Sequence, residues 1–310
     1  MAPLIVVVGP TGSGKTALAI TLAKQFNAEI LSADSMQFYR GMEIGTAAPT
    51  QEEQAQVPHH FVSCLNPDET MAAGKYQELA RAKVQELQQQ GKQVVVVGGS
   101  GLYVNALIDG LFEGPARDEA IRERLMEEAE TQGNDALMQR LQTVDPDYAA
   151  QLTSSNDLIR IVRALEVYEI TGTPFSILHQ EHQDSAQRLD ARFFGLDWDR
   201  EQLYARINTR VDAMVTAGWV EEVQALLNAG YGPELNRLKA LGYREIAAHL
   251  QGKQSLEEAL EATKMHHRRY AKRQLTWFRG DDRVHWLQCT PETTSAQLLS
   301  QCKEHLQDCI

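Results

Sequence analysis

The chain has 310 residues, of which 43% are hydrophobic and 23% are charged, a composition typical of a soluble globular protein with one large domain or two smaller ones. No apolar run approaches the roughly 18 residues of a membrane span, and Leu4 already begins a strand-like segment, so we expect no signal peptide, no membrane association and a cytoplasmic location. The net charge of −12 argues against a protein that coats nucleic acid over its whole surface, and four scattered cysteines without a C-x-x-C pair indicate reduced thiols and no zinc site.

The first element is an apolar run, Leu4–Val8, and it is followed by a glycine-rich loop with the sequence Gly9-Pro10-Thr11-Gly12-Ser13-Gly14-Lys15-Thr16. This loop fits the pattern G-x-x-x-x-G-K-[ST], and the apolar residues after it recur at helical spacing. Strand, loop and helix together predict a P-loop, in which backbone N–H groups, the helix N-terminus and Lys15 bind phosphate groups and the Thr16 hydroxyl holds Mg²⁺. Most P-loops bind ATP or GTP, so the motif alone indicates a kinase or an NTPase.

Two further strands follow, and polar residues or glycines stand at the end of each. The predicted elements are the strands Ala28–Ala33 and Val94–Val97, a helix over Met71–Gln90 and a short helix near Leu102. Strands that alternate with helices behind a P-loop predict an α/β fold with a doubly wound parallel sheet, as in P-loop NTPases. Ligands of such sheets bind at the carboxyl ends of the strands, and the P-loop, Asp34 and Ser100 all follow strand ends.

The pattern changes at residue 114, from which helices follow one another without a strand to about residue 187. These helices are predicted at Asp118–Gln132, Asp135–Thr143, Tyr148–Leu152 and Asn156–Thr171. We interpret residues 114–187 as a helical insertion domain between the first part of the core, residues 1–113, and the second, residues 188–310. The second part is predicted to contain the strands Ala191–Asp197 and Val284–Leu287 and helices over Arg200–Ala217, Trp219–Ala229, Leu238–Leu250, Leu256–Phe278 and Thr294–Leu306.

The residues that follow the second and third strands indicate which reaction the site can catalyse. A P-loop NTPase has an acid after a second apolar strand that holds Mg²⁺ or orients water, but here Val94–Val97 ends in Gly98-Gly99-Ser100. The missing acid argues against ATP hydrolysis. Asp34 could be a turn former, but with Ser35 and Gln37 beside it the turn offers both an acceptor and donors, which suits the recognition of a planar polar group.

Positive charge gathers at a few places in this acidic chain. Arg206 and Arg210 are four apart on one predicted helix, and Arg160 and Arg163 are three apart on another, so each pair shares a helix face and is suited to bind a pyrophosphate-sized anion or to lie in solvent. Residues 264–279 contain six Lys or Arg, no acid, and interleaved aromatic residues. Basic residues bind phosphates and aromatic rings stack on bases, so this helix favours nucleic-acid contact over a merely solvated face.

Taken together, the chain resembles the bacterial tRNA dimethylallyltransferase family over nearly its whole length. The matching motifs, in order, are GPTGSGKT, DSMQFYRGMEIGTA, GGSGLY, NDLIRIVRALEVYEITG, LKALGYREI and RRYAKRQLTWFR. The resemblance implies transfer of a dimethylallyl group from dimethylallyl diphosphate to N6 of adenosine-37, just 3′ of the tRNA anticodon. It also implies that the P-loop binds the prenyl diphosphate and not a nucleotide, and that the insertion and the basic helix grip the anticodon stem-loop.

The resemblance further implies roles for individual residues. The implied catalytic residues are Asp34, Ser100 and Arg210. Asp34 matches the aspartate that accepts a hydrogen bond from N6 and acts as general base. Ser100 stands where the family usually has threonine and keeps the hydroxyl, and Arg210 matches an arginine near the leaving diphosphate. The implied tRNA contacts are Asp34, Ser35, Met36, Gln37, Ser100, Arg122, Ile159, Arg160, Ile161, Val162, Arg163, Lys239, Gly242, Tyr243, Arg244, Arg269, Lys272 and Arg273. Mg²⁺ is the implied cofactor, with Thr16 as its ligand, and we expect a monomer.

Two positions depart from the family pattern. Ile159 stands where the family usually has Gln, and Ala48 where it usually has Lys, which puts one tRNA contact and one positive charge in question. The alternative function is a P-loop small-molecule kinase that uses ATP, with Asp34 as the base for an acceptor hydroxyl. Such a kinase has no use for a basic, aromatic-rich helix. A third alternative, a non-catalytic RNA-binding protein with a vestigial P-loop, conflicts with the presence of Lys15, Thr16 and Asp34.

Overall fold

The computed structural model describes residues 2–112, 114–152, 154–185 and 188–306, which divide into two units. Unit 1 combines the chain up to Ile108 with the chain from Leu189 onward, and unit 2 spans Asp109–Arg188. The boundaries predicted from the sequence lie close by, at residues 114 and 187. Within the described residues, none of the helices combines the length and the apolar character that crossing a bilayer requires.

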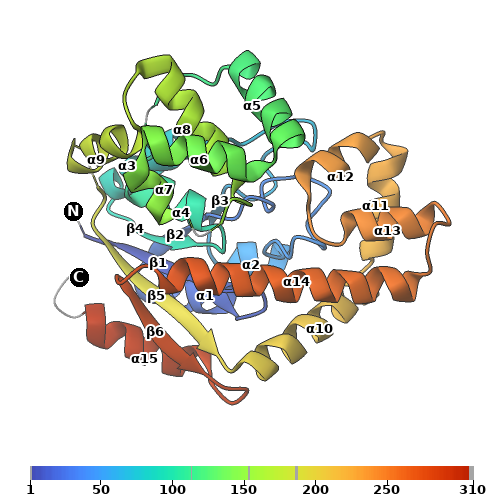
Figure 1. The fold of residues 1–310 in the computed structure, drawn as a ribbon. Helices are drawn as coiled ribbons and strands as arrows, with labels where there is room; N and C mark the ends of the chain where they lie inside the picture. Colours follow the sequence, from blue (N-terminus) through green and yellow to red (C-terminus); the bar gives the residue numbers. More distant parts are fainter. Residues whose placement is uncertain (1, 113, 153, 186–187, 307–310) are drawn as a thin grey trace. The chain divides into compact units, whose positions relative to one another are not determined.

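Unit 1 is built on a sheet that has, in its described residues, six strands in the order β3-β2-β4-β1-β5-β6, all paired in parallel (Figure 1). The strands are β1 (Leu4–Val8), β2 (Ala28–Ser32), β3 (His59–His60), β4 (Gln93–Val97), β5 (Ala191–Trp198) and β6 (Val284–Cys289). The predicted parallel sheet is therefore confirmed. β3 was not predicted, because two residues are too few to produce a hydrophobic pattern.

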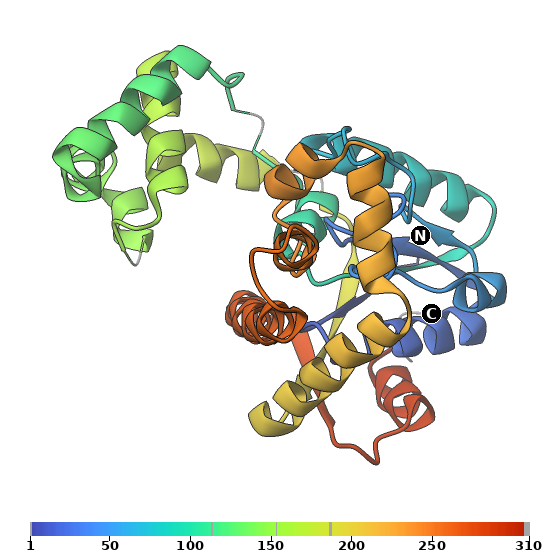
Figure 2. The same ribbon diagram turned by 90° about the vertical axis from the view of Figure 1, so that its right-hand side faces the viewer.

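Helices cover both faces of this sheet. All five residues of β1 are buried: Val6 packs in the cluster that contains α3 (Ala73–Gln89) and α4 (Gly101–Ile108), and Val7 in the cluster that contains α1 (Lys15–Gln25) and α15 (Ser295–Leu306). Figure 2 shows α1 and α15 together on one side of the sheet. Strands covered on both faces are continuously apolar, which is why they were readable in the sequence.

The remaining helices of unit 1 are α2 (Gln51–Gln56), α10 (Arg200–Thr216), α11 (Trp219–Asn228), α12 (Gly232–Leu238), α13 (Tyr243–Leu250) and α14 (Leu256–Arg279). The predicted single helix over Leu238–Leu250 is wrong. Lys239 and Gly242 have φ angles of 55° and 86°, in the left-handed region, and this backbone cannot continue a right-handed helix. Within the break, residues 239–241 line a cavity.

Unit 2 is helical, as the sequence predicts for the insertion. Its helices are α5 (Glu119–Gln132), α6 (Asn134–Val144), α7 (Pro146–Gln151), α8 (Leu158–Thr171) and α9 (Phe175–Ser185). It has its own apolar core, in which Leu125, Leu141 and Leu165 are fully buried. A unit with a separate core can keep its fold by its own contacts.

Candidate active site

The P-loop lies between β1 and α1, at the carboxyl edge of the sheet. Gly14 caps α1 with a φ of 96°, a conformation that favours glycine, and no side chain caps the helix. The backbone N–H groups of the first turn therefore remain available to an anion. Gly12 is also left-handed, at φ 79°, and a Cβ there would lie 3.0 Å from the Ile207 side chain, so the loop backbone packs closely on α10.

Three charged side chains meet beside this loop. Lys15 donates a hydrogen bond from Nζ to the Pro10 carbonyl at 2.8 Å. Burial lowers the pKa of Lys15 to about 8, against the raising effect of Asp34, and Arg210 lowers it further. Burial also lowers the pKa of Arg210, which the Asp34 carboxylate raises. Two cations beside one carboxylate, each with its pKa lowered by burial, form a site that a polyanionic ligand would stabilise.

The turn after β2 is tied to the turn after β4. Asp34 accepts the Met36 N–H at 3.0 Å through Oδ1, and Ser100 Oγ accepts the Ser35 N–H at 3.1 Å and donates to Ser35 Oγ at 3.2 Å. Asp34 is thus both a turn former and a carboxylate on the cavity wall. The side chain of Gln37 bonds to Ser32 Oγ and to the Ala47 carbonyl, so it organises the protein's own loop.

These groups line one cavity of about 1170 Å³ in unit 1. Its polar wall includes the P-loop residues Thr11, Gly12, Gly14, Lys15 and Thr16, the turn residues Asp34, Ser35, Met36 and Gln37, and Arg210, Lys239, His267, Tyr270, Arg273 and Gln274. Its apolar lining includes Ile44, Ala47 and Ala48 from the loop after β2, and Met214, Ala240 and Leu241 from α10 and the turn before α13. Ser35 lines this wall, and the Ser100 hydroxyl bonds to Ser35 from behind it. The catalytic role that the resemblance implies for Ser100 stays a prediction.

Gln274 of α14 is a site residue that sequence reasoning missed. Its Oε1 accepts the Thr11 N–H at 2.8 Å and its Nε2 donates to the Gly99 carbonyl at 2.9 Å. The side chain therefore joins the P-loop to the turn after β4, and a Cβ at residue 99 would lie 2.1 Å from Gln274 Nε2 and displace that amide from its hydrogen bond. The only signal in the sequence was a polar residue inside the basic helix, where it looked like one more exposed side chain.

Arg206, paired with Arg210 in the sequence analysis, has a different position. Its Nε donates to the Gly12 carbonyl at 2.9 Å, and its guanidinium lies 4.2 Å from the centre of the Trp198 ring. Trp198 in turn donates from Nε1 to the Ser13 carbonyl at 3.0 Å. Both side chains therefore hold the outside of the P-loop, while Arg210 lines the cavity within it.

Magnesium chemistry fits this cavity. Thr16 supplies a hydroxyl beside the P-loop, and the Asp34 carboxylate lines the same wall. Mg²⁺ prefers oxygen ligands and usually takes one or two from the protein and the rest from phosphates and water. Ser13 Oγ is a further hydroxyl of the loop, buried and without a hydrogen-bond partner among the described residues, as expected of a loop shaped for a ligand.

Comparison with known proteins decides the family. Residues 37–281 match the IPP transferase family. The chain is 46% identical to tRNA dimethylallyltransferase 2 of Geotalea uraniireducens, with 92% of each chain covered, and 47% identical to the tRNA dimethylallyltransferase of Geobacter sulfurreducens, with 92% of this chain and 91% of that protein covered. The chain belongs to the IPP transferase family.

Solved structures agree with this assignment of the IPP transferase. A tRNA isopentenylpyrophosphate transferase from Bacillus halodurans superposes with a TM-score of 0.71 at 37% identity, covering 99% of this chain and 98% of that one. A eukaryotic dimethylallyltransferase described as acting on tRNA superposes with a TM-score of 0.77 at 26% identity, covering 99% of this chain and 80% of that one.

Several tRNA contacts implied for this IPP transferase are buried, which corrects their assignment. Ile161 and Val162 are 0% and 1% exposed in the core of unit 2. Tyr243 is 0% exposed and donates hydrogen bonds from its hydroxyl inside unit 1, and Gly242 is buried against Trp219. These residues belong to the matching motifs because they pack in the protein interior. Side chains in the interior do not reach an RNA surface.

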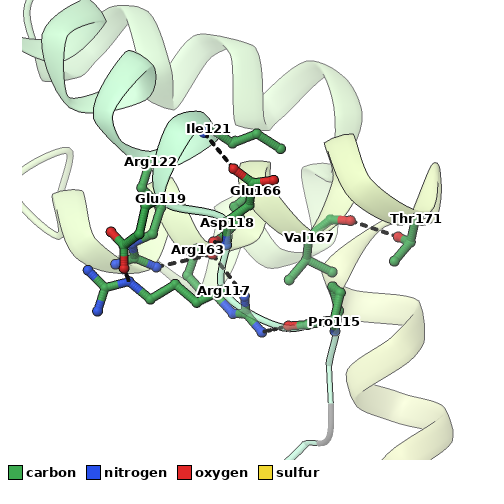
Figure 3. A network of polar contacts seen from close by, with 10 residues as sticks. All are labelled: Pro115, Arg117, Asp118, Glu119, Ile121, Arg122, Arg163, Glu166, Val167 and Thr171. Carbon is green, nitrogen blue, oxygen red and sulfur yellow. Dashed lines mark hydrogen bonds and ion pairs between the residues drawn. The ribbon is translucent and has the colours of Figure 1, made fainter.

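Arg122 and Arg163 of unit 2 share one buried carboxylate (Figure 3). Glu166, whose side chain is 0% exposed, bonds through Oε2 to Arg122 at 3.0 Å and to Arg163 at 2.8 Å, and through Oε1 to the Asp118 N–H at 2.8 Å. Burial would raise the pKa of Glu166, but Arg163, the Asp118 N–H and Arg122 together lower it. Arg163 also donates to the Pro115 carbonyl. Both arginines therefore hold unit 2 together in this structure.

Seven other predicted contacts lie at the surface. Lys239, Arg244, Arg269, Lys272 and Arg273 are exposed in unit 1. In unit 2 the Arg160 side chain is 53% exposed beside Asp157, and Ile159 is 71% exposed. These side chains can meet an RNA backbone, and three of them project from α14, where the sequence placed the basic face.

Proposed function

We propose that this chain is a tRNA dimethylallyltransferase, which transfers the dimethylallyl group of dimethylallyl diphosphate to N6 of adenosine-37 in tRNA. One observation carries the proposal. In a chain of the IPP transferase family, one cavity is lined by a P-loop, by the partly buried cations Lys15 and Arg210, by the Asp34 carboxylate and by apolar side chains. Relatives that are 46% and 47% identical to the chain are named tRNA dimethylallyltransferases. Dimethylallyl diphosphate has an anionic and an apolar end, which match the two kinds of wall.

The diphosphate end is assigned to the P-loop. The open N–H groups of α1, the Lys15 ammonium and the Arg210 guanidinium offset its charge, which grows on the leaving group as the bond to the allylic carbon breaks. Fixed donors at a developing charge lower the barrier, because they need no reorganisation during the reaction. Thr16 would hold Mg²⁺, which supplies further positive charge to the diphosphate when bound.

Asp34 is assigned as the base. The adenine N6 is a weak nucleophile because its lone pair is delocalised into the ring, and a carboxylate that accepts its proton makes attack easier. The N6–carbon bond forms, the carbon–oxygen bond to diphosphate breaks, the N6 proton passes to Asp34, and diphosphate leaves with the bonding electrons. Burial and then the nearby Asp34 carboxylate raise the pKa of Tyr270 to about 12, so this neighbouring phenol stays neutral at the cavity wall.

The tRNA is assigned to the exposed basic residues through its anticodon stem-loop. Arg269, Lys272 and Arg273 on α14 are exposed, and Arg273 also lines the cavity, so a phosphate backbone bound there lies next to the reaction site. The target base must leave its stack to reach Asp34, and a base in a loop does so at less cost than a paired one. We propose that a monomer carries out the reaction.

Transfer of label tests this function. The protein is mixed with Mg²⁺, labelled dimethylallyl diphosphate and an unmodified tRNA with adenosine at position 37, beside Asp34→Asn and beside a tRNA with guanosine at that position. We expect label in the first tRNA alone, and a loss of about 10²- to 10⁴-fold in rate for Asp34→Asn. The P-loop pattern favours a kinase as the competing function, so ATP is the second donor. Tight ATP binding without prenyl transfer to any tRNA would reject the proposal.

A further inference from the structure

A carboxylate that does not line the cavity accepts hydrogen bonds from the backbone of a loop that does. Glu222 of α11 accepts the Ile44 N–H at 2.8 Å through Oε2 and the Gly45 N–H at 3.1 Å through Oε1. Among the described residues, Glu222 forms no hydrogen bond with the P-loop or with the turn after β2. Its partners belong to the segment Glu43–Pro49, all of whose residues line the cavity.

Tyr243 of α13 completes this clamp. Its hydroxyl lies 2.7 Å from Glu222 Oε1 and 2.8 Å from the Met42 carbonyl oxygen, and its ring is 0% exposed. Burial is the main cause that raises the pKa of Glu222, against the effect of the three hydrogen bonds that it accepts. Two side chains thus bind the backbone at three residues of this loop, Met42, Ile44 and Gly45.

The loop lies directly on aromatic rings at this point. A Cβ at Gly45 would lie 2.0 Å from Trp219 Nε1 and 2.6 Å from Tyr243 Cε2, so only glycine fits. Ala47, two residues on, has a φ of 50°, which is unusual for a residue with a side chain. Backbone in such a conformation persists where its surroundings hold it in place, and here the Gln37 side chain donates to the Ala47 carbonyl.

The clamp holds one of the segments that supply the apolar lining of the cavity. This segment is the loop itself, with Ile44, Ala47 and Ala48. Further apolar lining comes from Met214 of α10 and from Ala240 and Leu241 of the turn before α13, whose first residue is Tyr243. The position of the loop in the cavity lining therefore depends on these hydrogen bonds.

We propose that Glu222 and Tyr243 are positioning residues that set the length of prenyl chain the cavity accepts, by holding the loop Glu43–Pro49 in its place in the cavity lining. The inference rests on the proposed function, because an apolar tail reaches this lining only if the diphosphate occupies the P-loop. The clamped loop then accepts a five-carbon group, and a ten-carbon group requires the loop to move.

The experiment compares Glu222→Gln and Tyr243→Phe with the wild type and with Glu221→Gln. Glu221 is the exposed neighbour on the same helix, so its variant carries the same change of charge without the clamp. Glu222→Gln keeps one carbonyl oxygen but turns an N–H group toward an N–H or hydroxyl partner, and Tyr243→Phe removes the hydroxyl while keeping the ring. Thermal melting of each variant first establishes that it is folded.

Hydrogen exchange and selectivity are then measured on the same proteins. We expect the amides of Ile44 and Gly45 to exchange at least about tenfold faster in Glu222→Gln, corresponding to the loss of about one hydrogen bond. We also expect the ratio of kcat/KM for dimethylallyl diphosphate over geranyl diphosphate to fall about tenfold, through KM, with kcat for the shorter donor nearly unchanged. Glu221→Gln should match the wild type in both measurements.

Two outcomes would overturn the inference. One is an unchanged donor ratio in folded variants whose loop amides exchange faster, which would make the clamp merely structural. The other is an unchanged exchange rate at Ile44 and Gly45. Equilibrium binding of unreactive thiolodiphosphate analogues of the two donors gives the same ratio without turnover. If the wild type transfers no prenyl group to tRNA, the proposed function fails, while exchange and analogue binding still decide whether the clamp selects chain length.

Discussion

The arginines of the two units show how differently one residue type is used in this protein. In unit 2, Arg122 and Arg163 meet a fully buried carboxylate, Glu166, that also accepts a backbone N–H. In unit 1, Arg210 lines a cavity beside Lys15, and among the described residues no carboxylate forms an ion pair with it. The first arrangement satisfies its own charges, while the second leaves positive charge unsatisfied.

The difference teaches where binding energy is stored. A buried pair whose partners are all present contributes little to ligand binding, because its charges are already compensated. Two cations that share one nearby carboxylate keep an excess of positive charge, and an anionic ligand offsets that excess on binding. Arginine pairs at helical spacing therefore indicate function only when the matching carboxylate is missing.

Replacement of Arg210 should give the largest effect of this comparison. We expect Arg210→Met to lower kcat/KM for prenyl transfer by about 10²- to 10³-fold, because the leaving diphosphate loses a fixed donor. Arg206→Met is the matched control one helical turn away; it should act mainly through a higher KM, since its side chain holds the Gly12 carbonyl. Steady-state kinetics with labelled donor decide the order, and equal effects of the two variants would contradict it.

Removal of the shared carboxylate should affect the stability of unit 2 and not the chemistry. We expect Glu166→Gln to cost about 3 kcal/mol in the unfolding free energy of unit 2, because Arg122 and Arg163 then lack their counterion in a buried place. Exchange rates of the amides of α8 and α5 under native conditions measure this locally. A decrease of less than about 1 kcal/mol in the unfolding free energy would contradict this prediction, because it would mean that water solvates the two arginines as it does in exposed ion pairs.

The cavity is also lined by a buried polar group, His267, which lacks the hydrogen-bond partners that satisfy Glu166. His267 is 7% exposed, and its Nε2 has no hydrogen-bond partner among the described residues. Burial, followed by the charge of Arg210, lowers the pKa of His267 from 6.5 to about 4. The unfolded chain then binds a proton between these pH values that the folded chain does not, so His267 makes stability fall as the pH falls through that range.

The histidine can be tested by acidification. Between pH 7 and pH 5 we expect the wild type to lose about 2 kcal/mol more unfolding free energy than His267→Gln. Urea denaturation at both pH values measures the difference, in which the other histidines cancel. Equal losses in the two proteins would show that His267 takes up its proton in the folded state.

The sequence was informative wherever a pattern depends on local chemistry. Val94–Val97 could be placed because a strand covered on both faces is apolar throughout, and the P-loop because its glycines and Lys15 have fixed spacing. The carboxylate at Asp34 followed from its position after a strand. Each of these features is determined by residues that are neighbours in the chain.

The features that the sequence left open depend on distant partners. Gln274 reaches Thr11, and Glu222 reaches Ile44, over separations that no local pattern reports. The motif around Tyr243 attracted a tRNA role because of its resemblance, whereas its hydroxyl is bonded inside the protein. The sequence thus identified the loops of the site, and the structure was needed to separate residues that face the ligand from those that hold the loops.

The smallest effect concerns the outer face of unit 2, where Ile159 stands in place of the usual Gln. Because Ile159 is 71% exposed, Ile159→Gln should change the unfolding free energy by less than about 0.5 kcal/mol. If this face meets tRNA, the amide adds a donor beside Arg160 and should tighten tRNA binding by about two- to threefold. Ile177→Gln, on another helix of the same unit and also exposed at 48%, controls for reduced surface hydrophobicity. Filter binding at fixed salt compares the affinities of the two variants for tRNA. Equal affinities would show that Ile159 is not part of the tRNA-binding surface, and the charged residues of unit 2 would then serve mainly its stability, as Glu166, Arg122 and Arg163 do.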